Sequence, residues 1–224
     1  MAAAISLVVL LVLDTVVPRS TNLDATSIAG ITIGVSIAAD DTVTLEESYD
    51  LRLRSPEGGT SPRFVRSVEV PKGLAPSFAC TGEHNGTPFV TEVRPFDSTY
   101  LWLPQTYSQD VDGPISRFSF SCTAKGLVQR DGHERKLTFP LIDRRYTLPA
   151  EALTARLYFL FPPREDPVGV PRVRAEIIPA EGSPTPAAIV QERPNVFVLN
   201  IRDPLEIGTD ARLIVTWRPP GPLT

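Results

Sequence analysis

Residues 31–53 read ITIGVSIAADDTVTLEESYDLRL. Apolar and polar side chains alternate on both sides of the Ala-Ala-Asp-Asp turn, and this period of two places one face of a strand on a core and the other in water. The stretch therefore predicts two antiparallel strands joined by a tight turn, a β-hairpin that opens a domain. Only Glu47 interrupts the apolar face, near the middle of the second strand.

The same alternation recurs along the rest of the chain, in short segments separated by Pro, Gly, Asp and Ser. This pattern predicts an all-β fold, an antiparallel β-sandwich of about 10–12 short strands. One stretch, 149–155, is predicted instead to form one or two turns of helix. The further expected strands are 64–70, 78–80, 89–93, 100–103, 118–124, 137–141, 157–161, 170–178, 196–201 and 213–217.

Composition excludes some classes of partner. The 224 residues carry 22 basic and 26 acidic side chains, a net charge of −4, and no long run of like charge. Proteins that bind phosphate backbones need basic patches, so no nucleic-acid partner is expected. The 23 prolines are scattered along the chain, which disfavours long helices but is compatible with strand ends and turns.

The N-terminal segment 1–19 contains an apolar run from Ala2 to Leu13 that is broken only by Ser6 and ends at Asp14. Counted through Asp14 to Val17, the stretch is about 16 residues, short of the roughly 20 that span a bilayer as a helix. We predict a retained signal anchor or a cleaved signal peptide, although a buried strand or helix of a soluble protein stays open. Either form of export predicts an extracytoplasmic location, membrane-anchored or secreted.

The division into domains is left open by the sequence. We expect a linker at 20–27 and one β-sandwich region at 28–224. The proline-rich and charged stretch 162–167 allows an alternative, in which 28–161 and 168–224 are two packed β sub-domains. The second piece is small for a β domain that folds alone.

Cys80 and Cys122 are the two cysteines, and each lies on the apolar side of an alternating segment. An even number of cysteines behind an export segment predicts one disulfide bond. Two reduced, buried thiols in a cytosolic protein are the alternative if the N-terminal segment is not a targeting signal.

One group of residues has the chemistry of a metal site: His84 and His133, with the acidic neighbours Glu83, Asp131 and Glu134. If the disulfide pairs the two cysteine strands, the turns that carry the histidines can lie at one end of the sandwich and bind Zn²⁺ or Cu²⁺. The alternative is that they are ordinary exposed turn residues.

Two further groups are candidate sites. Asn85-Gly86-Thr87 has the pattern of a glycosylation acceptor, and it is also a typical turn sequence. The aromatic residues Tyr100, Trp102 and Tyr107 form a possible platform for a glycan or peptide, with the alternative that they belong to the core and its rim.

No nucleophile elbow, phosphate loop, dinucleotide motif or H-E-x-x-H sequence occurs, and these are the short motifs of common catalytic sites. We therefore predict no catalytic residue and no cofactor, and a non-enzymatic protein that binds a protein partner at the cell envelope or surface. It would contact the membrane through its N-terminal segment. The alternatives are a metal-binding or metal-dependent enzyme that uses His84 and His133, and a carbohydrate-binding module.

Overall fold

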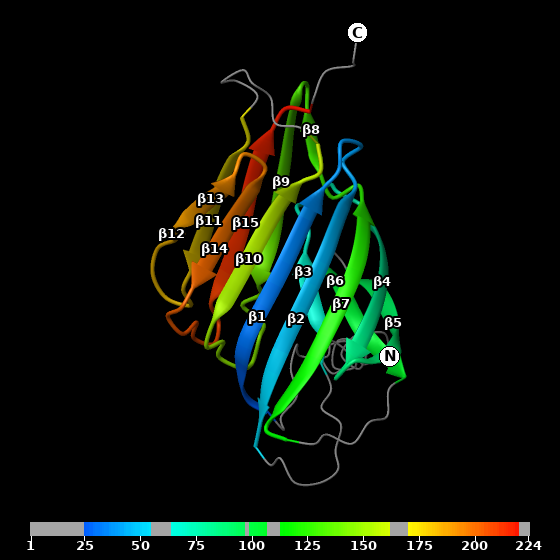
Figure 1. Ribbon diagram of the computed structural model, residues 1–224, viewed down its shortest axis with the longest axis vertical. Coiled ribbons are helices and arrows are strands. Elements are labelled where there is room, and N and C mark those ends of the chain that lie inside the picture. Colours follow the sequence, from blue (N-terminus) through cyan, green and yellow to red (C-terminus); the bar gives the residue numbers. More distant parts are fainter. Residues whose placement is uncertain (1–24, 55–63, 97–98, 107–112, 162–169, 220–224) are drawn as a thin grey trace, which may run out of the picture.

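The computed structural model describes residues 25–54, 64–96, 99–106, 113–161 and 170–219. These residues form an all-β fold, as the sequence predicts (Figure 1). The strands are β1 Ala25–Ile37, β2 Val43–Leu53, β3 Arg66–Glu69, β4 Ser77–His84, β5 Thr87–Phe96, β6 Thr99–Thr106, β7 Ile115–Lys125, β8 Gln129–Asp131, β9 Glu134–Ile142, β10 Leu153–Phe159, β11 Arg172–Ile178, β12 Thr185–Ala187, β13 Ile189–Arg193, β14 Val196–Ile201 and β15 Asp210–Trp217.

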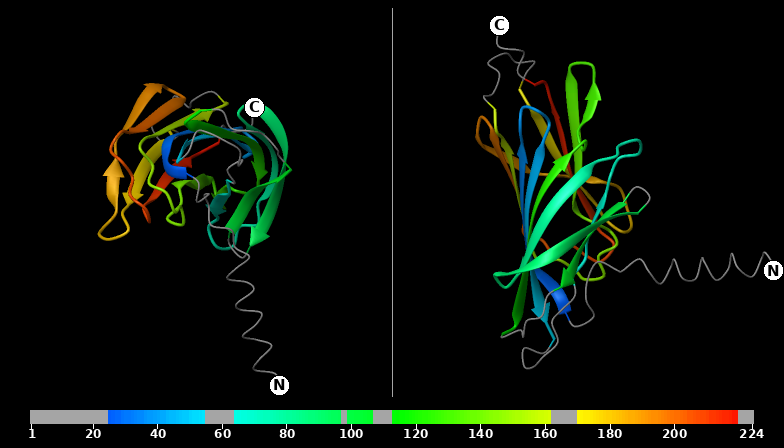
Figure 2. Two further views of the ribbon diagram at one scale, coloured as in Figure 1. Left: turned by 90° about the horizontal axis from the view of Figure 1, so that it is seen from below. Right: turned by 90° about the vertical axis from the view of Figure 1, so that its right-hand side faces the viewer.

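The strands of the described residues make two sheets. The large sheet has the order β13-β14-β10-β1-β2-β7-β4-β5-β6-β3, and the small sheet has the order β12-β11-β15-β9-β8. Neighbouring strands are antiparallel except β1 and β10, which pair in parallel. The large sheet is strongly curved (Figure 2, left), so that its last strand, β3, comes round to contact β9 of the small sheet. The two sheets enclose one core.

The predicted hairpin is confirmed. β1 and β2 pair antiparallel around a turn that joins Ile37 to Val43, and the apolar positions of both strands point into the core. The turn residue Asp41 has a positive φ of 68°, a conformation that Asp tolerates better than most residues. The alternation of side chains therefore sets the register of the central strands.

The expectation of a helix at 149–155 is wrong. Ala150 makes an isolated bridge with Ile28 and another with Leu205, and its N–H donates to the Leu205 carbonyl at 2.9 Å. Leu153 then begins β10, which alternates buried and less buried residues. The segment is extended because pairing with distant strands satisfies its backbone, which outweighs a weak local preference for helix.

Strands from both sides of 162–167 share both sheets. In the large sheet β10 lies between β1 and β14, and in the small sheet β15 lies between β9 and β11. The segment 1–19 and residues 20–24 of the expected linker lie outside the described residues, whereas Ala25 already belongs to β1. Within the described part of the chain, no helix has the length and apolar character needed to span a membrane.

Candidate functional site

Cys80 and Cys122 form the disulfide bond that the sequence predicts. They are direct partners in the register of β4 and β7, with their Cα atoms 4.1 Å apart. Cys122 is buried, Cys80 is half-buried, and the Trp102 indole N–H donates to the Cys80 sulfur. A disulfide in this position is compatible with an extracytoplasmic location.

His84 is the last residue of β4, and its side chain is buried rather than exposed in a turn. Its ring stacks on Phe118, with the centroids 4.4 Å apart, and its Nε2 lies 2.6 Å from Ser116 Oγ. Burial lowers the pKa of His84, because the apolar surroundings disfavour the charged imidazolium. The neutral ring therefore packs as part of the core.

His133 lies far from His84. It is exposed in the turn between β8 and β9, which follow the end of β7 at Lys125, whereas His84 pairs with Phe118 near the start of β7. Seven residues of strand span about 23 Å, and ligands of one ion must converge on it. Glu83 lies beside His84 in sequence, while Asp131 and Glu134 lie at the other end with His133. Across the described ranges, no three potential ligands converge on one point.

The aromatic residues do not form an exposed platform. The side chain of Trp102 is buried, and that of Tyr100 is half-buried. Both pack on Phe78, with ring centroids 4.9 Å from Tyr100 and 5.3 Å from Trp102. Tyr107 lies outside the described residues. Trp102 and Tyr100 thus belong to the core and its margin.

Asn85 and Gly86 form the two-residue turn of the β4–β5 hairpin, with positive φ angles of 49° and 81°. These angles are typical of the turn type that Asn-Gly favours. The side-chain carbonyl of Asn85 accepts a hydrogen bond from the Arg117 N–H at 2.7 Å. Asn85 is exposed, and its role as a glycosylation acceptor stays a prediction.

A buried ion pair occupies the centre of the core. Glu47 accepts hydrogen bonds from Arg66 Nε at 2.9 Å and from the Tyr49 hydroxyl at 2.9 Å. The Arg66 guanidinium also donates to the Pro140 carbonyl at 2.7 Å, and it lies over the ring of Trp102. Because both side chains are buried, with exposures of 0% and 2%, and bond to each other and to the core, the pair has a structural role.

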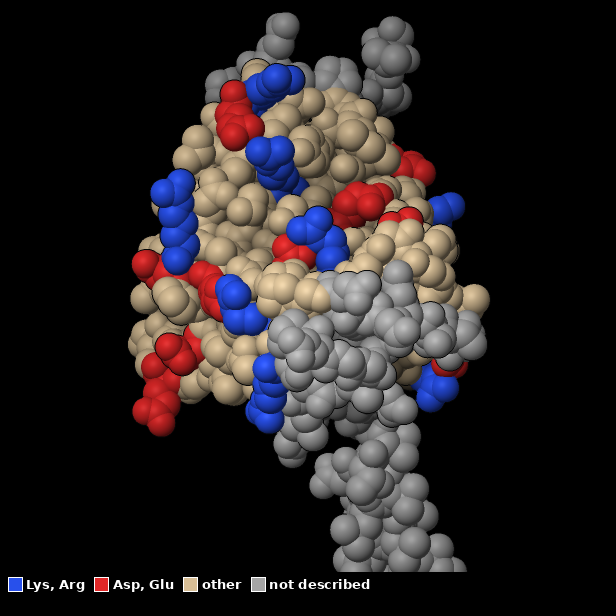
Figure 3. Space-filling view, turned by 60° about the horizontal axis from the view of Figure 1, so that its bottom comes forward, with Lys and Arg blue, Asp and Glu red and all other residues tan. Residues whose placement is uncertain are grey.

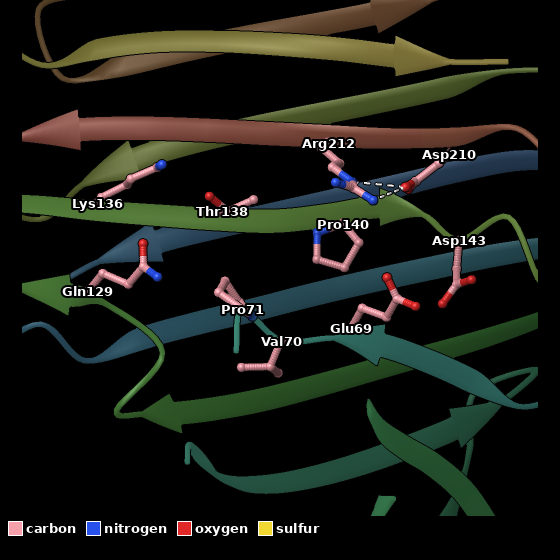
Figure 4. A pocket seen from close by; sticks show the side chains of 10 residues that line it. All are labelled: Glu69, Val70, Pro71, Gln129, Lys136, Thr138, Pro140, Asp143, Asp210 and Arg212. Carbon is pink, nitrogen blue, oxygen red and sulfur yellow. Dashed lines mark hydrogen bonds and ion pairs between the residues drawn. The ribbon is translucent and has the colours of Figure 1, made fainter. Parts of the chain in front are cut away.

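One hollow lies at the seam where the end of β3 meets the small sheet. It has a volume of about 260 Å³, and Figure 4 shows its charged side chains, of which three are carboxylates. Each carboxylate has an arginine within 4 Å, in the pairs Glu69–Arg144, Asp143–Arg145 and Asp210–Arg212. Burial raises the pKa of Asp210. Since each acidic side chain here is paired with an arginine of the same chain, we assign these residues to the contact between the two sheets.

A second hollow lies on the outer face of the large sheet, which is turned toward the viewer in Figure 1. It has a volume of about 460 Å³. Small hydroxyl side chains line it, with three glutamates, and Pro88 lies at one side. The polar lining residues are Thr32, Glu46, Glu47, Ser48, Thr81, Glu83, Ser119 and Ser121. Of these, Glu47 has a buried side chain that pairs with Arg66.

Ion pairs border the outer face. Arg117 Nε lies 2.6 Å from Asp50 Oδ1, and Arg52 lies 2.9 Å from Glu151. Figure 3 shows basic and acidic side chains interspersed, with uncharged surface between them. We regard the outer face with its hollow as the candidate functional site. The sequence shows most of these residues only as the polar half of the strand pattern. Of the residues in the hollow, reasoning from sequence singled out Glu83, as a candidate metal ligand, and Glu47, as the exception to the apolar face.

No protein-family model matches the chain, and no curated protein sequence matches it. Solved structures give distant matches. Leukotriene A4 hydrolase from Saccharomyces cerevisiae has a TM-score of 0.46 and 7% identity over 87% of this chain. The M1 zinc metallopeptidase from Deinococcus radiodurans has a TM-score of 0.44 and 9% identity, also over 87% of this chain. The chain spans 30% of the first protein and 43% of the second.

Proposed function

We propose that the protein is a non-enzymatic β-sandwich that acts outside the cytoplasm, anchored to a membrane or secreted. It binds a protein partner through the outer face of its large sheet. The observation that carries this proposal is the open, hydroxyl-lined face with its hollow of about 460 Å³.

The dimensions of the outer face suit a protein partner. The five adjacent strands β10, β1, β2, β7 and β4 span roughly 24 Å across, and seven residues of each span about 23 Å along the strands. The resulting area of roughly 600 Å² approaches the ~800 Å² that each partner buries in a standard interface. Backbone held in a sheet loses little entropy on binding, which lowers the cost of association.

The disulfide supports the extracytoplasmic part of the proposal, because disulfides persist mainly in oxidising compartments. The apolar segment 1–19 gives a route for export or anchoring. Both parts are tested when full-length tagged protein is expressed in its host and the mature N-terminus and the redox state of Cys80 are measured. Uncleaved protein with reduced thiols in the soluble cytosol would overturn the location.

Complex formation is tested by introducing large side chains on the outer face. Ser119 and Ser121 point outward from β7, so replacing both with Arg should block a partner while leaving the core intact. Ser183→Arg in the exposed turn before β12 is the matched control. Sedimentation of the extracted full chain should show a complex for wild type and S183R, and the free chain for the double variant. A wild-type protein that sediments as the free chain contradicts the proposal, as does a complex that survives in the double variant.

A further inference from the structure

The hollow on the outer face holds two carboxylates that have no cationic partner among the residues that the structure describes. Glu46 accepts a hydrogen bond from Ser121 Oγ at 2.7 Å, and Glu83 is exposed beside the hollow. In contrast, the bordering acids Asp50 and Glu151 are each paired with an arginine. The negative charge of the hollow is therefore left for a ligand to neutralise.

The strand register places the two carboxylates at opposite corners of the hollow. One row across the sheet contains Glu46, Ser121 and Thr81, and the next row contains Ser48, Ser119 and Glu83. Glu46 and Glu83 are thus separated by two strand spacings and two residues, a Cα–Cα separation of about 12 Å. Between them stand only small hydroxyl side chains, which accept hydrogen bonds and leave room for a group to enter.

This arrangement favours a guanidinium group over a metal ion. The ligands of a single metal ion must lie about 2.5 Å from it. In the described part of the chain, no three His, Cys, Asp or Glu side chains lie close enough together to do so. A guanidinium donates five hydrogen bonds from two edges of a rigid plane, so it can reach acceptors on both sides of the hollow. Pro88 supplies apolar surface for the methylene stem.

We propose that the hollow between Glu46 and Glu83 binds an arginine side chain presented by the protein partner. The inference rests on the proposed function and names the chemistry of that partner. The guanidinium lies between the two carboxylates and receives further contacts from Ser119 and Ser121. The chain has a net charge of −4, which also favours association with a basic partner.

The test is an NMR titration of the isotope-labelled full chain with N-acetyl-arginine amide. N-acetyl-citrulline amide, which has the same shape without the charge, is the matched probe. Binding is expected on the order of millimolar, since exposed ion pairs are weak. The arginine probe should shift the amide signals of Ser119 and Ser121. Its affinity should exceed that of the citrulline probe by about fivefold.

The variant E46Q/E83Q should bind the arginine probe about fivefold more weakly than wild type does. The control E181Q/E192Q removes two exposed acids elsewhere and should bind the probe as wild type does. Equal binding of the two probes overturns the inference, as do unchanged binding by E46Q/E83Q and shifts confined to another face. Shifts of the same amides by calcium chloride or methyl glucoside in place of the arginine probe also overturn it. If the sedimenting complex persists in E46Q/E83Q, protein binding stands and the arginine site fails. If wild type forms no complex, the proposed function fails.

Discussion

Glu47 and Arg66 form an ion pair in the centre of the core, with Arg66 Nε 2.9 Å from Glu47 Oε2 and side-chain exposures of 2% and 0%. Glu47 belongs to β2 in the middle of the large sheet, and Arg66 belongs to β3 at its end. The same guanidinium donates to the Pro140 carbonyl of β9. One arginine thus connects the middle of the large sheet, its curled end and the small sheet.

Replacing Arg66 with Met should destabilise the protein by about 3 to 5 kcal/mol, because Glu47 is left as an unpaired buried charge. Arg52→Met is the matched control, since Arg52 belongs to an exposed ion pair and its loss should cost much less, because exposed pairs are screened by water. Urea denaturation measures both free energies of unfolding. Similar losses in the two variants would show that burial of the Glu47–Arg66 pair does not have the predicted effect.

Removing the disulfide with C80A/C122A should lower the free energy of unfolding by about 4 kcal/mol, because a long loop is no longer closed in the unfolded chain. The cysteines are separated by 42 residues in sequence. Adding a thiol reductant during the denaturation experiment should destabilise wild type and leave the double variant unchanged. An equal effect of reductant on both proteins would contradict the disulfide.

Gly82 of β4 has no room for a side chain. A Cβ atom there would clash with the Phe89 ring, so Gly82→Ala should cost about 1 to 3 kcal/mol through overpacking. Gly34→Ala on β1 is the control, because its Cβ would lie 3.5 Å from Glu46 Cβ, an ordinary contact. Thermal unfolding should separate the two variants, and an equally stable Gly82→Ala protein would contradict the packing of Phe89.

Glu151 should contribute stability that depends on pH. Hydrogen bonds from Arg52 and Ser27 lower its pKa from 4.5 to about 2. A carboxyl whose pKa is lowered on folding stabilises the native state above its unfolded pKa, and this contribution disappears as the pH falls to the folded pKa. Glu151→Gln should therefore be less stable than wild type at pH 6. The difference should shrink between about pH 4.5 and pH 2, and a difference independent of pH would contradict the prediction.

Alternation of side chains was sufficient to predict the all-β fold and the first hairpin, since β1 and β2 each have one buried face and one more exposed face. It also placed Cys80 and Cys122 on the apolar side of their strands. The three-residue strands β8 and β12 and the exposed edge strand β13 were not predicted. Their sequences QRD, TPA and IVQER do not show a buried face.

Sequence reasoning identified Glu47 as the exception to the apolar face, but it did not identify Arg66 as its partner. The two residues come together only because the large sheet curls, and that curvature depends on contacts between strands far apart in the chain. His84 shows the opposite case: it stands beside a polar turn in sequence, yet the pairing of β4 with β7 places its ring on Phe118. The hollow on the outer face depends on the lateral order of β1, β2, β7 and β4, which local patterns do not determine.

The most direct test of the account is photo-crosslinking in intact cells, with a photoreactive phenylalanine introduced at Thr81 of the outer face or at Ser183 as the control; both side chains are exposed. The account predicts one discrete protein adduct from the Thr81 position, absent at Ser183 and absent when Ser119 and Ser121 are both replaced with Arg. Crosslinks of equal yield from both positions, or none from Thr81, would contradict it.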